Sequence, residues 1–303
     1  MAIKLTSFNI LFAASSIFCV PLALQAQDLE PRSYTNLPIG QHFIAAGYAN
    51  SSGEVSPSPS APVEDAKLDI DAYIVGYATS FSLFGSSAKF DTAVSRSCFT
   101  GSARLQGDKV SVDRCGYTDP TFRLSWNFFG APAMEIQDFS AWHQGLVIGA
   151  SMQVTAPLGS YQTDKLLNSG ANRWVYRPGV GMSHRIGRWY YDIIASIRFY
   201  GDNDEYLGDG QLSQDPQVNL QAHLIYNFNR GHWLSLNGNF FFGGETVKNG
   251  IQSDDDQQNS RFGLTYSYSL TAKHSLKLSV STGVLTRYGN DFDTYGLMWQ
   301  YRL

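Results

Sequence analysis

The chain alternates apolar and polar side chains in about twelve segments that begin after residue 40. Successive side chains of a strand point to opposite faces, so each segment predicts a strand with one apolar and one polar face. Each segment is about as long as the 9–11 residues with which a tilted strand crosses a bilayer, or somewhat longer. The pattern predicts an all-β fold, a transmembrane antiparallel up-and-down β-barrel of about twelve strands. The segments are 41–50, 67–81, 88–96, 117–128, 145–157, 173–185, 188–200, 217–228, 232–242, 260–270, 275–286 and 294–303.

The last segment keeps this alternation up to the final residue. Its large apolar side chains, which would share one face, are Tyr295, Leu297, Trp299, Tyr301 and Leu303. A C-terminal strand with an aromatic outer face is typical of a bacterial outer-membrane barrel, whose last strand closes onto the first. Such barrels usually end in an aromatic residue. Because this chain ends in leucine, we expect the barrel-assembly machinery to recognise it less strongly.

The connections between the segments alternate in length. Short ones lie at 82–87, 186–187, 229–231 and 271–274, and long polar ones at 51–66, 97–116, 158–172, 201–216 and 243–259. Outer-membrane barrels have short periplasmic turns and long external loops, and an even strand count places both ends in the periplasm. The connection 129–144 is long although it falls on the short side. Its apolar residues have helical spacing, which predicts a short periplasmic helix there.

Three segments show the outer face of such a barrel most clearly. In 189–199, the residues of one face are aromatic at the ends and aliphatic in the middle, and 218–228 and 262–270 have similar faces. Aromatic rings favour the headgroup level and aliphatic side chains the hydrocarbon level, so these faces predict an aromatic girdle.

The chain divides into three parts. Lys4, the apolar run from Ile10 to Val20 and the small Ala26 predict a secretory signal peptide at 1–26. Residues 27–40 are rich in proline and polar residues and predict a periplasmic lead-in. Residues 41–303 would form the outer-membrane barrel of a Gram-negative cell.

The net charge bears on whether the protein binds nucleic acid, and the cysteines bear on whether it contains a disulfide or a zinc site. The net charge is −4, with 22 basic against 26 acidic residues, which argues against a nucleic-acid partner. Cys98 and Cys115 would remain after signal cleavage, and the oxidising secretory route predicts a disulfide between them. Zinc is the weaker alternative, because neither cysteine has a histidine or second cysteine at ligand spacing.

Charged and polar residues on the inner faces are candidates for lining the lumen, because charge near the midplane of the lipid face costs about 2–4 kcal/mol. They could form a polar channel or solute site with a basic stripe from Arg123, Arg177 and Arg198, or they could be ion pairs that fill a narrow barrel. A barrel of about twelve strands lies between filled eight-stranded and open sixteen-stranded barrels, so the strand count is compatible with a polar channel or with a filled interior. The candidates are Arg123, Arg177, Asp192, Arg198, Gln221, His223, Arg261, Lys277 and Arg302, and alternation also places Asp69 and Asp71 inside.

Enzymatic and metal chemistry have little support. A membrane phospholipase would need a serine activated by a histidine, but the His-x-Ser-Asn-Gly context of that family does not occur. His274 and Ser275 are adjacent, so a strand would place them on opposite faces. The acidic loops 202–205 and 254–256 lack the calcium-loop pattern. We expect no catalytic residue, metal or cofactor.

Several short motifs occur in order along the chain. They are Asp28-Leu29-Glu30-Pro31-Arg32, Arg123-Leu124-Ser125-Trp126-Asn127, Gly130-Ala131-Pro132-Ala133, Ala156-Pro157-Leu158-Gly159-Ser160-Tyr161, Asn172-Arg173-Trp174, Asp202-Asn203-Asp204, Gln214-Asp215-Pro216 and Phe292 through Arg302. Together they resemble one bacterial outer-membrane family, named for the MetA pathway of phenol degradation. The resemblance implies an outer-membrane barrel that passes aromatic or other hydrophobic compounds. It implies no catalytic residues. The loop that carries Cys98 and Cys115 departs from the family pattern.

The leading hypothesis is therefore a channel or transporter-like, porin-like barrel for passive passage of small solutes, including aromatic and hydrophobic ones. Its expected partners are the solute, the lipid bilayer with its lipopolysaccharide, and the assembly machinery. The alternative is a closed structural or adhesive barrel whose external loops bind a partner. An outer-membrane lipase ranks below both.

Overall fold

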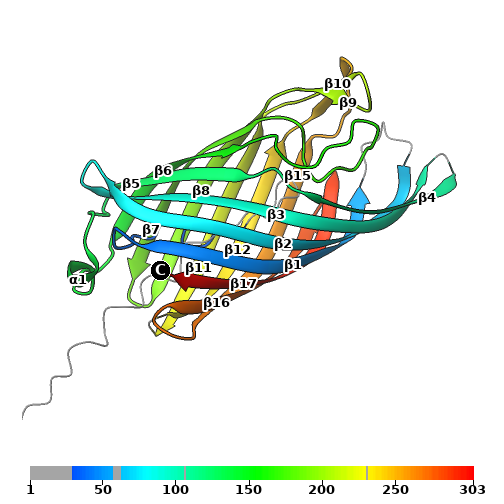
Figure 1. Ribbon diagram of the computed structural model, residues 1–303. Coiled ribbons are helices and arrows are strands. Elements are labelled where there is room, and N and C mark those ends of the chain that lie inside the picture. The colour runs from blue at the N-terminus through cyan, green and yellow to red at the C-terminus, as the bar shows by residue number, and fades with distance from the viewer. Residues whose placement is uncertain (1–28, 57–62, 106, 230) are drawn as a thin grey trace, which may run out of the picture.

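Twelve antiparallel strands form a closed barrel in the computed structural model, which describes residues 29–303 apart from 57–62, 106 and 230 (Figure 1). This confirms the predicted fold class, while the expected signal peptide lies outside the described residues. The barrel strands are β1 (His42–Ser56), β2 (Val63–Leu83), β3 (Ser86–Leu105), β5 (Thr121–Phe129), β6 (Leu146–Thr155), β7 (Val175–Ile186), β8 (Trp189–Tyr200), β11 (Gln217–Asn229), β12 (His232–Gly243), β15 (Gln257–Ser269), β16 (His274–Leu285) and β17 (Gly289–Arg302).

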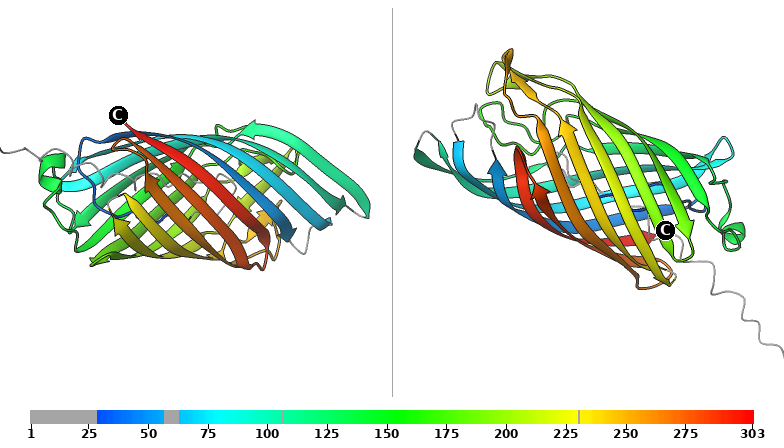
Figure 2. Two further views of the ribbon diagram at one scale, coloured as in Figure 1. Left: turned by 90° about the horizontal axis from the view of Figure 1, so that it is seen from below. Right: turned by 180° about the vertical axis from the view of Figure 1, so that it is seen from behind.

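The last strand closes the barrel onto the first. β17 pairs with β1 from Phe43 opposite Arg302 to Ser56 opposite Gly289. The remaining neighbours along the sheet are joined by antiparallel pairing, and the tilt of the strands is visible from two further directions (Figure 2). Closure satisfies the backbone groups that an open sheet edge would leave unpaired in lipid.

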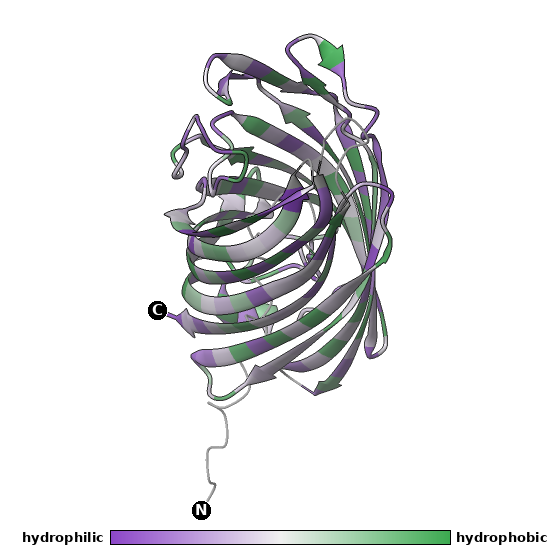
Figure 3. Cartoon of the chain, turned by 90° about the vertical axis from the view of Figure 1, so that its right-hand side faces the viewer, coloured by the Kyte–Doolittle hydropathy of each residue, from purple (hydrophilic) through white to green (hydrophobic). Residues whose placement is uncertain are grey.

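The outer faces carry the predicted apolar stripes. Along β8, Trp189, Tyr191, Ile193, Ile197 and Phe199 are exposed, while the residues between them are mostly buried. The same alternation runs along β11 and β15 and gives each strand its banded hydropathy in the view along the barrel (Figure 3). Among the described residues, no helix is long and apolar enough to cross a membrane.

The long connections are more ordered than predicted. The segment 97–116 is not a loop, because β3 runs on to Leu105 and pairs with β4 (Asp108–Tyr117). The predicted disulfide is present between Cys98 and Cys115, which lie directly opposite each other on these strands. The connections after β8 and β12 together form a separate four-stranded sheet of β9 (Asn203–Tyr206), β10 (Gly210–Gln214), β13 (Thr246–Lys248) and β14 (Ile251–Gln252).

The short turns, the start of β1 and the C-terminus lie at the rim of the barrel opposite β9 and β10 (Figure 1). Here the long connection 130–145 contains α1 (Ile136–Phe139), the short helix that its apolar spacing predicts. Met134 lies just before it and accepts a backbone hydrogen bond from Ile39. This connection therefore packs beside the N-terminal segment at the rim with the short turns.

Residues 29–37 are inside the barrel, and this differs from the expected periplasmic lead-in. Glu30, Arg32, Tyr34 and Leu37 are all less than 9% exposed. We call residues 29–40 the N-terminal segment. Its proline and polar residues, which predict a periplasmic lead-in, find hydrogen-bond partners on the inner wall instead.

The interior has two chemically different sides. The inner faces of β5, β6, β7, β8, β11 and β12 carry arginine, asparagine, glutamine and serine side chains, and we call them the polar wall. The apolar wall consists of the inner faces of β1 and β2 with Phe99, Phe292 and Met298; its buried side chains include Ala45, Ala49, Leu68, Ile70, Ala72, Ile74 and Ala78.

Asp69 and Asp71 are the exception to the predicted inner charges. The inner positions of this part of β2 are Leu68, Ile70 and Ala72, so the two aspartates point outward. There they accept hydrogen bonds from Asn50, at 3.0 Å for Asp69 and 3.1 Å for Asp71. The prediction was wrong because alternation gives two faces but does not say which one is inside when both carry apolar residues.

Candidate functional site

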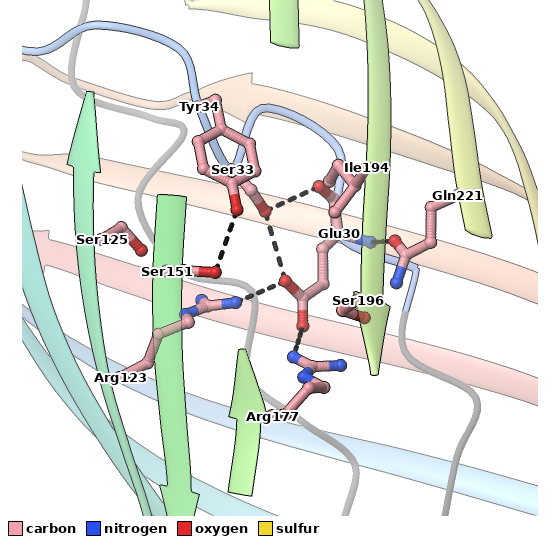
Figure 4. Close-up of a pocket in the computed structure, with 10 residues that line it drawn as sticks. All are labelled: Glu30, Ser33, Tyr34, Arg123, Ser125, Ser151, Arg177, Ile194, Ser196 and Gln221. Atoms are coloured by element: carbon pink, nitrogen blue, oxygen red, sulfur yellow. Dashed lines mark hydrogen bonds and ion pairs between the residues drawn. The ribbon is translucent and has the colours of Figure 1, made fainter. Parts of the chain in front are cut away.

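The N-terminal segment turns back on itself inside the barrel. Residues 31–34 form a turn in which the amide of Thr35 donates to the carbonyl of Arg32 at 3.2 Å. Arg32 has a φ of 69°, a left-handed conformation that is uncommon for a residue other than glycine. The turn presents Glu30 and Tyr34 to the same part of the polar wall (Figure 4).

The Glu30 carboxylate lies between two guanidinium groups. Arg177 Nη2 donates to Glu30 Oε1 at 2.5 Å, and Arg123 Nη1 donates to Oε2. Arg177 comes from β7 and Arg123 from β5, and all three side chains are about 6–7% exposed. We call Arg123 and Arg177 the clasp, and the carboxylate that it holds is that of Glu30. Charge-assisted hydrogen bonds of this kind are about twice as strong as neutral ones, so the clasp fixes the segment to the wall.

Each arginine also contacts the wall itself. Arg123 Nε donates to Asp91 Oδ1 at 3.1 Å, and Arg177 Nη2 donates to Gln153 Oε1 at 2.8 Å. Burial alone would raise the pKa of Glu30, but the two guanidinium charges outweigh burial and lower the pKa well below its ordinary value. The carboxylate is therefore ionised at neutral pH.

Tyr34 occupies a hollow that two glycines create. A Cβ at Gly181 of β7 would lie 2.2 Å from Tyr34 Cε2, and one at Gly149 of β6 would lie 2.5 Å from Cδ1. Any side chain at these positions would overlap the ring, so we call the pair the glycine hollow. The phenol hydroxyl lies 2.9 Å from the Ser151 hydroxyl. Tyr34 and Ser151 line one small pocket of the wall together with Arg123 and Arg177 (Figure 4).

Arg32 anchors the other side of the turn. Its backbone amide donates to Asp192 Oδ2 at 2.8 Å, and the amide of Glu30 donates to Gln221 Oε1 at 3.1 Å. The Arg32 guanidinium lies 4.7 Å from the ring centroid of Tyr190 and 5.0 Å from that of Trp233. Such cation–π contacts add about 0.5–2 kcal/mol each, depending on desolvation.

The other end of the segment meets the apolar wall. Leu37 packs with Phe43, Ala45 and Ala78, and Met298 lies against this cluster. The segment therefore bridges the two walls, with charge and aromatic contacts on one side and aliphatic contacts on the other.

All nine predicted lumen candidates are buried on the inner face, but only some contact the segment. Arg123, Arg177, Asp192 and Gln221 do so directly. The other five lie elsewhere in the interior. Three of them form hydrogen bonds there: His223 with Asn237 at 2.8 Å, Arg198 with Gln217 at 3.1 Å, and Arg261 with Thr294 at 2.7 Å. The Lys277 ammonium lies 5.8 Å from the centroid of the Trp233 ring, and Arg302 is the cross-strand neighbour of Phe43. The predicted basic stripe is thus divided, because Arg198 does not share the Glu30 clasp.

Glu30, Arg32 and Tyr34 were missed as site residues. The sequence contains one indication of them, the charges of Glu30 and Arg32 on either side of Pro31. These residues lie in the stretch that was predicted to be a periplasmic lead-in. Buried charges need partners, so a surplus of inner arginines could have indicated a carboxylate from outside the strands.

The residues considered for enzyme or metal chemistry do not come together. His274 Nδ1 accepts a hydrogen bond from Trp299 at 3.2 Å, whereas Ser275 bonds Gln300 on the other face. The described part of the chain contains no group of three histidine, cysteine or acidic residues placed to hold a metal ion.

The fold has counterparts among solved structures. An outer-membrane channel from Pseudomonas putida F1 superposes with a TM-score of 0.74 at 21% identity, over 91% of this chain and all of that one (100%). The transport unit of the autotransporter AIDA-I from Escherichia coli gives 0.51 at 10% identity, over 92% of this chain and 94% of that one. These identities are low enough that the likeness establishes the shared outer-membrane barrel fold alone.

A search of curated protein sequences found no match. A family described as "Putative MetA-pathway of phenol degradation" matches residues 51–301, which is most of the chain and agrees with the resemblance seen in its motifs. The chain belongs to this family.

Proposed function

We propose that the protein is a passive outer-membrane channel for small aromatic or hydrophobic solutes. The observation that carries the proposal is the two-sided interior of the closed barrel, with aliphatic side chains facing arginines, amides and hydroxyls. An aromatic solute with a polar substituent is itself two-sided and could slide along both walls. Pockets for such molecules are mostly apolar with a few polar groups that fix orientation.

The comparisons support a channel without identifying its solute. The Pseudomonas putida F1 protein, which shares the fold, is an outer membrane channel. The family description points to phenol degradation, in which aromatic compounds must enter the cell. We infer that this chain shares the transport role and acts without catalytic residues, cofactor or nucleotide.

The proposed setting is the outer membrane, with lipid on the apolar stripes and lipopolysaccharide around the external strands. The rim with the short turns and the C-terminus would face the periplasm. Insertion would depend on the assembly machinery, which is expected to recognise the β17 strand.

One observation favours the second candidate, a closed structural barrel. The N-terminal segment fills part of the lumen and is tied to both walls. In a closed barrel these contacts would be permanent, and the ordered external sheet would be the working surface. In a channel they would restrict passage to small solutes.

Liposome swelling separates the two candidates. Purified protein in liposomes would be challenged with iso-osmotic benzyl alcohol, phenol or sucrose, with protein-free liposomes to correct for direct membrane permeation. The channel predicts protein-dependent entry of the aromatic solutes with little entry of sucrose. A closed barrel predicts the protein-free rate for every solute, and that result would contradict the proposal.

A further inference from the structure

We propose that the Arg123–Arg177 clasp and the glycine hollow form a binding site for aromatic carboxylates, which the protein's own Glu30 and Tyr34 occupy as an internal ligand. This inference rests on the proposed channel function and names the solute class of its polar wall. The groups of the polar wall that bind the Glu30 carboxylate and the Tyr34 ring would bind the same chemical groups of a solute.

The clasp has the chemistry of a carboxylate site. Two guanidinium groups from different strands donate to the two oxygens of one carboxylate, one to each. Arginine is favoured wherever planar carboxylates are bound, because its donors match their geometry. Both arginines are held in place from the wall side, by Asp91 and Gln153, so their positions do not depend on Glu30 alone.

The charge balance favours an incoming anion. Lys89, whose Nζ donates to the Ser33 carbonyl, lies on β3 with Asp91 and adds a third positive charge near the clasp. If Glu30 leaves, one negative charge is lost from beside these three cations, and a buried site tolerates such a loss poorly without a replacement anion.

The hollow beside the clasp fits an aromatic ring. Gly149 and Gly181 leave room for the Tyr34 ring, and Ser151 bonds its hydroxyl at 2.9 Å. Tyr34 and Ser151 line the same pocket as Arg123 and Arg177, and the side chains of Glu30 and Tyr34 come together there (Figure 4). A carboxylate and a phenol presented to one pocket resemble a hydroxy-substituted aromatic acid. Such a solute would compete with the N-terminal segment for the wall.

The test measures binding in detergent, so that it does not depend on transport. Isothermal titration calorimetry would compare 4-hydroxybenzoate with the neutral 4-hydroxybenzyl alcohol on wild type, Glu30→Gln and the double variant Glu30→Gln/Arg177→Gln. Glu64→Gln is the matched control, because Glu64 is an exposed glutamate of β2. Heat-modifiable migration on gels would verify that each variant is a folded barrel.

We expect Glu30→Gln to bind 4-hydroxybenzoate about tenfold or more tightly than wild type does, since a hydrogen bond to a charged group contributes about that factor. The alcohol should gain much less, the double variant should lose the gain, and Glu64→Gln should match wild type. Equal gains for acid and alcohol, no gain in Glu30→Gln, or a gain that survives in the double variant would overturn the inference.

The outcome is distinguishable from failure of the channel proposal. If liposomes show no aromatic entry but the calorimetric pattern holds, the barrel binds aromatic acids without passing them. If entry occurs but the pattern is absent, the channel stands and the carboxylate site does not.

Discussion

The two walls of the barrel interior differ in how they are built, although the same strand alternation produces both. On the polar wall, buried arginines, asparagines and glutamines bond one another across strands, as Arg198 does with Gln217 and His223 with Asn237. On the apolar wall, small alanines alternate with Ile70 and Ile74 and need no partners. Alternation therefore defines the barrel, whereas the chemistry of each inner face decides what the barrel can hold.

The N-terminal segment uses this difference. Its charged half docks on the polar wall, and Leu37 docks on the apolar wall. Losing the polar contacts should therefore free the segment far more than losing the aliphatic ones.

Arg177→Gln should have the largest effect. It removes one guanidinium from a buried ion pair, and breaking such a pair costs about 3–5 kcal/mol because the remaining carboxylate stays buried. We expect the segment to leave the wall and single-channel conductance in planar bilayers to rise well above the wild-type value. Conductance equal to wild type would show that the clasp does not hold the segment in the lumen.

Ile74→Asn tests the apolar wall. Burying an amide without partners costs about 1–3 kcal/mol, and it also removes the aliphatic surface on which a ring would slide. We expect slower entry of benzyl alcohol into liposomes, with Ile74→Val as the matched control near wild-type rate. Unchanged entry in Ile74→Asn would mean that solutes do not use this wall.

Arg198→Gln should have a smaller effect on conductance than Arg177→Gln. Arg198 bonds Gln217 and not the Glu30 carboxylate, so its replacement removes that hydrogen bond, worth about 1 kcal/mol, and leaves the bonds from Arg123 and Arg177 to Glu30 in place. Anion preference, measured as the reversal potential in a salt gradient, should nevertheless fall because a buried positive charge is lost. A rise in conductance as large as that of Arg177→Gln would remove the distinction between the two arginines.

Replacing both Cys98 and Cys115 by serine should affect the lumen least. The disulfide joins β3 and β4 over a sequence separation of 17, where chain-entropy arguments give about 3 kcal/mol. We expect faster proteolysis of the β3–β4 hairpin with unchanged conductance. Altered conductance would indicate that this hairpin contributes to the pore.

The sequence predicts the barrel well because alternation, turn lengths and aromatic stripes all report on the same lipid-facing surface. The stripe of Trp189, Tyr191 and Ile193 is exposed as expected, and the helix at Ile136–Phe139 follows from its spacing. The inner-face prediction also placed Arg123 and Arg177 correctly within the interior.

The site itself could not be predicted in the same way. Alternation places a side chain on a face but does not identify its partner, so the Glu30 clasp was not evident from Arg123 and Arg177. The glycine hollow was also hidden, because Gly149 and Gly181 matter through the Tyr34 ring that they admit. Asp69 and Asp71 were placed on the wrong face, because the inner positions of this part of β2 are the apolar Leu68, Ile70 and Ala72.

We propose that the N-terminal segment, which lies in the lumen, limits what passes through the barrel. Gly181→Ala tests this most directly, because its methyl group would meet Tyr34 inside the barrel, whereas the control Gly238→Ala would meet only the Phe262 and Phe240 rings at ordinary contact distance. For both variants, folding would be verified by heat-modifiable migration. We expect a single-channel conductance above wild type for Gly181→Ala and a wild-type value for Gly238→Ala. Identical conductance in all three proteins would show that the segment does not limit passage.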